Sequence, residues 1–89
     1  MPQVVMYTTS WCPYCRAAKS LFAAKKVEFT EIDVTDEPKL RLDMERLSGR
    51  RTVPQIFING QPMGGYDDVL SLETSGELDK LLNETPGTA

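Results

Sequence analysis

The sequence contains no histidine, and this absence excludes two common kinds of functional site. A catalytic Cys–His pair, of the kind that cysteine proteases use, cannot be assembled from these residues. A zinc site made only of cysteine and histidine needs four ligands, whereas the chain supplies two cysteines. A zinc ion or an iron–sulfur cluster would require a second chain or an added thiol, so we expect no metal.

Long apolar runs and dense basic clusters are also missing. No segment approaches the roughly 20 apolar residues that span a bilayer. The net charge is −3, and the densest basic cluster is the short "GRR" of residues 49 to 51, so we expect no nucleic-acid partner. The opening "MPQVVMYTTS" lacks the charged and apolar regions of a secretory signal. We therefore expect a cytoplasmic protein with no membrane segment.

Both cysteines lie in "SWCPYC", at positions 12 and 15. This spacing is open to three interpretations: a structural disulfide, half of a metal site, or a redox-active dithiol. A structural disulfide is disfavoured, because cytosolic thiols are normally reduced and because closing so short a loop contributes little stability. The missing ligands count against a metal site. The sequence therefore favours the redox-active dithiol.

The chain is long enough for one small domain, which we assign to residues 1–89 with a frayed tail at 84–89. "VVMY" (4 to 7) predicts a strand, and "RAAKSLFAAKK" (16 to 26) predicts a helix whose first turn includes Pro13. Ala18, Leu21 and Phe22 share one face of that helix. "VEFTEIDV" (27 to 34) predicts a second strand, although its apolar alternation changes parity; a bulge or an early strand end would explain the change.

The remaining elements follow from capping residues and turn signals. Asp36 and Pro38 predict the start of a helix with an apolar core stripe, ended by Gly49; the stripe consists of Leu40, Met44 and Leu47. "PQIFING" and "QPMGG" predict a hairpin that turns at Asn59-Gly60, with the second strand at an edge. Two short helices follow, and Thr74 with Glu77 fits a capping box. The predicted order is β-α-β-α-β-β-α-α.

The cysteines thus stand where a strand leads into a helix. Unpaired N–H groups and the helix dipole favour an anion at a helix N-terminus, so Cys12 is well placed to react as a thiolate. Arg16 and Lys19 could add to this effect. Cys15 lies about one helical turn after Cys12, which brings its sulfur back towards the Cys12 sulfur. One exposed nucleophile and one covered thiol suit thiol–disulfide exchange.

Three segments together resemble the glutaredoxin family. Cys12-Pro13-Tyr14-Cys15 is similar to the active site of dithiol glutaredoxins, "TVPQIFING" (52 to 60) to the segment around the third strand of the family, and "GGYDD" (64 to 68) to its glutathione-binding turn. The resemblance runs from about residue 4 to residue 82. It implies a thioredoxin fold, an α/β structure whose four-stranded mixed sheet is flanked by helices, and glutathione as bound reductant.

The resemblance also implies a glutathione groove. It implies a cis peptide bond at Pro54, backbone contacts from Val53 to the cysteinyl part of glutathione, and a γ-glutamyl site in the "GGYDD" turn. The implied groove consists of Tyr14, Thr52, Val53, Pro54, Gly64, Gly65, Asp67 and Asp68. The paired glycines would let N–H groups approach an anion, and one of the two aspartates should cap the following helix.

Two positions depart from the family. Glutaredoxins often carry a lysine three residues before the first cysteine, where this chain has Thr9; Arg50 or Arg51 could replace it. Trp11 resembles the tryptophan that precedes the first cysteine of thioredoxins.

We therefore expect a glutathione–disulfide oxidoreductase that acts as a monomer on protein disulfides and glutathionylated proteins, with ribonucleotide reductase and other reductases among the partners that the family suggests. Two alternatives remain open. A thioredoxin-like protein recharged by a flavoprotein is disfavoured by Pro13-Tyr14 and the "GGYDD" turn. A dimer that binds an iron–sulfur cluster through Cys12 of each chain and glutathione is disfavoured by Pro13 beside Cys12.

Overall fold

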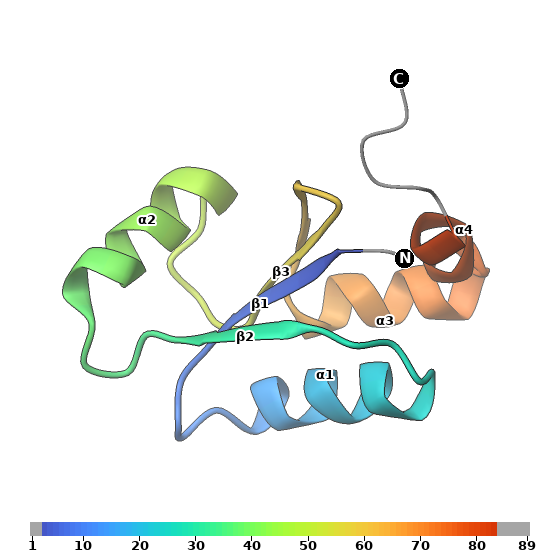
Figure 1. Cartoon of the computed structure of the whole chain (residues 1–89), viewed down its shortest axis with the longest axis horizontal. Helices are drawn as coiled ribbons and strands as arrows, with labels where there is room; N and C mark the ends of the chain where they lie inside the picture. Colours follow the sequence, from blue (N-terminus) through green and yellow to red (C-terminus); the bar gives the residue numbers. More distant parts are fainter. Residues whose placement is uncertain (1–2, 84–89) are drawn as a thin grey trace.

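The computed structural model describes residues 3–83 and contains one four-stranded sheet in the order β2-β1-β3-β4 (Figure 1). β1 is parallel to β2 and antiparallel to β3, which is antiparallel to β4, so the sheet is mixed as predicted. The strands are β1 (Val4–Thr8), β2 (Thr30–Asp33), β3 (Gln55–Ile58) and β4 (Gln61–Gly64). The helices are α1 (Pro13–Ala24), α2 (Pro38–Ser48), α3 (Tyr66–Ser75) and α4 (Glu77–Asn83). The predicted element order is confirmed.

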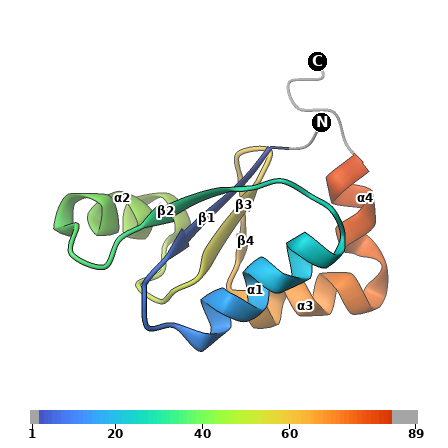
Figure 2. The same ribbon diagram turned by 60° about the horizontal axis from the view of Figure 1, so that its bottom comes forward.

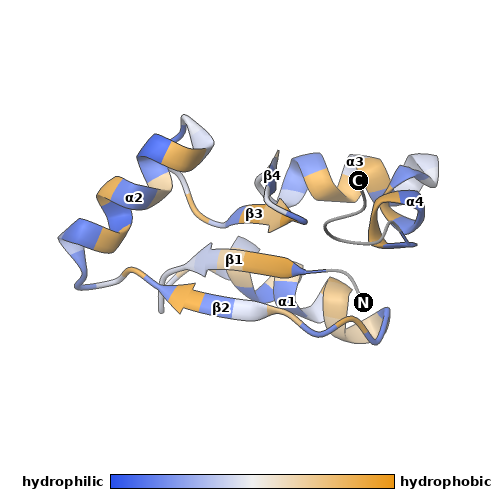
Figure 3. Cartoon of the chain, turned by 45° about the horizontal axis from the view of Figure 1, so that its top comes forward, coloured by the Kyte–Doolittle hydropathy of each residue, from blue (hydrophilic) through white to orange (hydrophobic). Residues whose placement is uncertain are grey.

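Helices cover both faces of the sheet, and the inner strands alternate accordingly. α1 and α3 lie on one face and α2 on the other (Figure 2). Met6 and Ile56 belong to the core cluster beneath α1, α3 and α4, whereas Tyr7 and Phe57 pack with Met44 of α2. Successive strand residues point to opposite faces, so β1 and β3 must be apolar at nearly every position. Figure 3 shows the large hydrophobic segments of these two strands.

The same two-layer arrangement explains the change of parity around β2. Val27 and Phe29 pack against the α1–α3 core, whereas Ile32 and Val34 pack with the α2 core. The apolar residues therefore pack on opposite faces in turn, and the change of parity needs no bulge. β2 itself is shorter than predicted, because it begins at Thr30 and ends at Asp33.

Two predictions about α2 are wrong. Its N-cap is Glu37, whose side chain makes no capping bond, instead of Asp36. Met44 is fully buried, but Leu47 is 52% exposed, because it lies in the last turn of α2 at the rim of a shallow hollow over Tyr7 and Phe57. The start at Pro38 and the end at Gly49 are confirmed.

The predicted turn at Asn59-Gly60 is confirmed, whereas the predicted capping box at Thr74 is wrong. Asn59 and Gly60 both have left-handed backbone angles, with φ of 52° and 83°, as a type I′ hairpin requires. Thr74, however, lies inside α3, and its hydroxyl donates to the Leu70 carbonyl, so the predicted capping box with Glu77 does not form. The tail at 84–89 lies outside the described residues. No helix within residues 3–83 is long and apolar enough to cross a bilayer.

Phe22 should be a major contributor to stability, because its ring is fully buried in the α1 core. We expect Phe22→Ala to lower the free energy of unfolding by about 3–5 kcal/mol through lost transfer energy and the cavity left behind. Urea unfolding would measure this, with Leu42→Ala on exposed α2 surface as the control. Equal losses for the two variants would contradict the assignment of this core.

Candidate functional site

The two cysteines occupy the N-terminus of α1, directly after the loop that leaves β1. Cys12 is the N-cap residue, and Pro13 opens the helix, where its missing N–H leaves no bond unmade. The Cys15 N–H donates a hydrogen bond to the Cys12 sulfur over 3.1 Å. Main-chain N–H groups at a helix N-terminus lack partners within the helix, and the Cys12 sulfur is the acceptor that meets one of them. Both cysteines are free thiols.

The environments of the two sulfurs are unequal. Cys12 is partly exposed, whereas Cys15 has no exposed surface. Burial, followed by the hydrogen bond with Cys12, raises the pKa of the Cys15 thiol from an ordinary 9.0 to about 12. Cys15 therefore remains protonated at neutral pH. The ammonium of Lys19, which we expected to add to the effect of the helix terminus, pairs with Glu31 at 2.9 Å and also acts on Cys15, whose pKa it lowers as the smallest of several causes.

The loop before β3 approaches the cysteines from the other side. The Val53–Pro54 peptide bond is cis, as the resemblance implies. The Val53 carbonyl oxygen lies 3.5 Å from the Cys12 sulfur and can accept its thiol hydrogen. Gln55 was not among the predicted site residues, yet its buried amide donates to both the carbonyl and the hydroxyl of Thr52, at 2.9 and 3.1 Å. A polar residue at a fully buried strand position was the signal that could have identified it.

The "GGYDD" turn forms the start of α3. The Asp68 carboxylate accepts the Gly65 N–H at 3.0 Å, so Asp68 is the aspartate that caps this helix. Gly64 has φ of 94°, and an added Cβ there would collide with the Asp68 carboxylate, so glycine is required. Asp68 also pairs with Arg50 at 2.7 Å, and this bond, with that from Gly65, holds the pKa of its carboxyl below the ordinary value.

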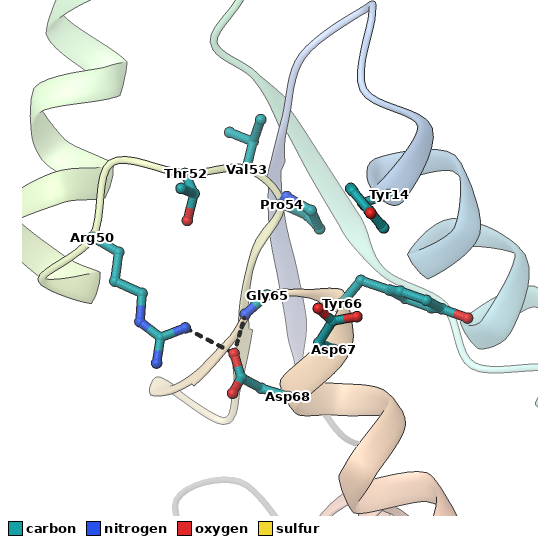
Figure 4. Close-up of a pocket in the computed structure, with 9 residues that line it drawn as sticks. All are labelled: Tyr14, Arg50, Thr52, Val53, Pro54, Gly65, Tyr66, Asp67 and Asp68. Carbon is teal, nitrogen blue, oxygen red and sulfur yellow. Dashed lines mark hydrogen bonds and ion pairs between the residues drawn. The ribbon is translucent and has the colours of Figure 1, made fainter.

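These segments enclose an open cleft of about 290 Å³. The rings of Tyr14 and Tyr66, with centroids 6.3 Å apart, lie on one side of it, and Arg50 lies on the other (Figure 4). Seven predicted groove residues line the cleft, while Gly64 lies buried next to it. The lining consists of Tyr14, Arg50, Thr52, Val53, Pro54, Gly65, Tyr66, Asp67 and Asp68.

Charged residues around the cleft differ in their availability. Asp67 faces the cleft and is exposed, and within residues 3–83 its carboxylate has no hydrogen-bond or ion-pair partner. Of the two arginines proposed to replace the missing lysine, only Arg50 lines the cleft. Arg51 is 88% exposed and pairs with Glu45 at 3.2 Å. Thr9 is not part of the lining. The described part of the chain holds no group of three or more His, Cys, Asp or Glu residues suited to a metal ion.

Tyr66 was also missed as a site residue, although it lies inside the quoted "GGYDD" motif. From the sequence alone, an aromatic residue at the first position of a helix is equally consistent with a core residue and with a site residue. Its place beside Tyr14 depends on how α1 and α3 pack.

The family model for glutaredoxin matches residues 4–63. A glutaredoxin of Pseudomonas aeruginosa is 51% identical over 93% of this chain and 99% of its own length, and glutaredoxin 3 of Escherichia coli is 46% identical over 92% and 99%.

Solved structures agree with the sequence matches. The solution structure of glutaredoxin from Brucella melitensis has a TM-score of 0.81 at 48% identity and covers 98% of this chain and 92% of its own. The crystal structure of a buckwheat glutaredoxin–glutathione complex has a TM-score of 0.83 at 29% identity over 89% and 74%. With its paired cysteines at the start of α1 and a thioredoxin fold around them, this chain belongs to the glutaredoxin family of thiol oxidoreductases.

Proposed function

We propose that the protein is a glutathione-dependent thiol–disulfide oxidoreductase that reduces glutathionylated proteins and protein disulfides. The observation that carries this proposal is the place of the Cys12 sulfur. It accepts an N–H at the start of α1 and lies beside the carbonyl of Val53, at the edge of the cleft. The Cys12 sulfur therefore lies next to Val53, a residue that lines the cleft together with polar and charged groups. The glutathione complex of the buckwheat protein supports the same ligand here.

The first route uses Cys12 alone. Its thiolate attacks the glutathione sulfur of a glutathionylated protein, and the protein sulfur leaves as a thiolate that takes up a proton. The new Cys12–glutathione disulfide is then attacked by a second glutathione thiolate. This step frees Cys12 and releases oxidised glutathione, so one glutathione thiol is consumed and its sulfur takes the place of the protein sulfur in the disulfide.

The second route needs both cysteines. Cys12 attacks one sulfur of a protein disulfide, and the other protein sulfur leaves as a thiolate. Cys15 then loses its proton and attacks the Cys12 sulfur, which releases the second protein thiol and forms the Cys12–Cys15 disulfide. Two glutathiones reduce that disulfide and leave as oxidised glutathione. The buried, protonated state of Cys15 suits this order, because Cys15 reacts only when a disulfide already occupies Cys12.

For glutathione itself we propose an orientation along the cleft. The cysteinyl backbone would pair with Val53, and Tyr14 would cover the sulfur end. The γ-glutamyl carboxylate would meet the N–H groups at the start of α3, beside Gly65, and its ammonium would meet the unpartnered Asp67. The glycyl carboxylate would meet the guanidinium of Arg50 through nitrogens other than the Nη1 that pairs with Asp68 at 2.7 Å.

Single substitutions of the cysteines should separate the two routes. We expect Cys12→Ser to abolish turnover of a glutathionylated peptide and of a peptide disulfide, because serine is not a thiolate nucleophile. Cys15→Ser should retain the first activity and lose the second. A coupled assay of oxidised glutathione measures both. A wild-type protein that cannot use glutathione would contradict the proposed function, and an active Cys12→Ser would contradict the assigned nucleophile.

The protonation of Cys15 can be followed in Cys12→Ser, which removes the other thiol. Burial remains the main cause of its raised pKa, so we expect no thiolate absorbance from neutral pH up to about pH 10 in the folded variant. Unfolding restores an ordinary pKa near 9.0, so the stability that Cys15 contributes should be present below about pH 9 and fall as pH rises towards 12. Titration of the folded variant near 9 would contradict this.

The charged residues of the cleft should act on substrate binding. We expect Arg50→Gln and Asp67→Asn each to raise the KM for a glutathionylated peptide about tenfold, equivalent to one lost charge-assisted hydrogen bond, with kcat little changed. Arg51→Gln is the matched control, because Arg51 points away to Glu45. Steady-state kinetics on folded variants measure this. An unchanged KM in both cleft variants would refute the orientation proposed for glutathione.

A further inference from the structure

Trp11 is the most exposed large apolar side chain in the described part of the chain. It is 84% exposed, directly precedes Cys12, and does not line the cleft. An indole left in water forgoes the free energy that its burial would release, and exposed aromatics are enriched where proteins bind partners. The position of Trp11 therefore indicates contact with something that arrives at Cys12.

The backbone that carries Trp11 is held in place. The Ser10 N–H donates to the Thr35 hydroxyl at 2.9 Å, and the Ser10 hydroxyl lies 3.4 Å from the Asp33 carboxylate. The Cys12 N–H meets the Thr9 carbonyl at 3.5 Å. Trp11 thus extends into solvent from a loop fixed at both sides, which is the arrangement of a preformed contact surface.

The neighbouring loop is acidic. β1 and β2 are parallel, so their carboxyl ends lie at the same end of the sheet. The segment 33–37, which follows β2, therefore lies beside the loop of Trp11, which follows β1 (Figure 2). We call this segment the acidic loop; its acidic residues are Asp33, Asp36 and Glu37. Bonds from Thr35 lower the pKa of Asp33, which keeps it charged.

The other two carboxylates of the acidic loop are available. Asp36 and Glu37 are exposed, and within residues 3–83 their side chains have no ion-pair partner. Arg41 lines the same hollow as Asp36 and Glu37, but its guanidinium donates to the Arg51 carbonyl at 3.1 Å. The acidic loop therefore presents two exposed carboxylates that have no ion-pair partner within residues 3–83.

We propose that Trp11 and the acidic loop form the docking surface for polypeptide substrates that carry lysine or arginine close to the reactive cysteine. This proposal rests on the function proposed above and deepens it. When Cys12 attacks a protein disulfide, the substrate chain becomes covalently attached to Cys12 and must lie across its neighbours. The cleft covers one side of Cys12, and Trp11 with the acidic loop provides the surface outside that cleft. A basic, partly apolar segment matches that surface, because its cations can pair with the carboxylates of the acidic loop and its apolar side chains can pack on Trp11.

The docking step adds no chemistry of its own. The Cys12 thiolate forms a bond to one substrate sulfur, the other sulfur leaves as a thiolate, and Cys15 and two glutathiones complete the reduction as described. Contacts at Trp11 should therefore change kcat/KM for polypeptides and leave small glutathione disulfides unaffected.

The first test compares three substrates: two peptide disulfides that differ only in lysines or glutamates beside the cysteines, and the mixed disulfide of glutathione with 2-mercaptoethanol. We expect the wild type to prefer the lysine peptide about tenfold. Trp11→Ser should lower kcat/KM for the lysine peptide about tenfold, the usual cost of truncating an aromatic anchor, with the small disulfide unchanged. Leu42→Ser, which alters an exposed apolar residue on α2, is the control and should change neither.

The second test addresses the charge. Asp36→Asn with Glu37→Gln should abolish the preference for the lysine peptide. Glu28→Gln with Glu77→Gln makes the same change in net charge; Glu28 precedes β2 at the opposite end from the acidic loop, and Glu77 begins α4, so this pair should retain the preference.

Each contrary result has a distinct meaning. Equal loss on the peptide and the small disulfide in Trp11→Ser would overturn the proposal, because Trp11 would then only shape the Cys12 loop. A wild type that does not distinguish the two peptides would overturn the role of the acidic loop. A wild type that fails on the small disulfide would instead overturn the glutathione-dependent function itself.

Discussion

The hydrogen bond from the Cys15 N–H to the Cys12 sulfur is the interaction on which the rest of the site depends. It exists because Cys12 is the N-cap of α1 and Cys15 lies in the first turn, so a main-chain donor that would otherwise lack a partner points at the reactive sulfur. The same turn buries the Cys15 sulfur beneath the helix start. One local geometry thus creates both a partly exposed sulfur that accepts an N–H and a covered, protonated partner.

The sheet determines what this helix terminus faces. β1 ends shortly before Cys12. β3, its antiparallel neighbour, begins at the same end of the sheet, directly after the cis Val53–Pro54 bond. The Val53 carbonyl therefore meets the Cys12 sulfur, and the buried amide of Gln55 holds the preceding Thr52. β4 then leads into α3, whose N-terminus closes the far side of the cleft. Asp68 links these parts, because one carboxylate caps α3 and pairs with Arg50 from the opposite wall.

Cys12 is consequently flanked by two surfaces of different character. The cleft is concave, enclosed by tyrosines and polar groups, and has room for a small ligand. The Trp11 side is exposed, and it joins the acidic loop through the hydrogen bonds of Ser10. The reaction proposed for this protein alternates between glutathione and a much larger polypeptide, and it would need both kinds of surface next to one sulfur. The N-terminus of α1 is the place where the two surfaces meet.

Much of this arrangement follows from local sequence. The paired cysteines with Pro13, the Asn59-Gly60 turn and the Gly49 helix end each specify backbone geometry within a few residues, and each was predicted correctly. The errors arose where packing overrides a local signal: Leu47 fits an apolar stripe, yet α2 ends over an uncovered part of the sheet, and Thr74 bonds within α3 instead of capping α4. The sequence by itself therefore determined the element order and the position of the cysteine pair at a helix N-terminus. Only the tertiary structure decided that Arg50 and not Arg51 lines the cleft, that Asp68 is engaged while Asp67 is available, and that Tyr66 joins Tyr14, because those contacts join segments far apart in the chain.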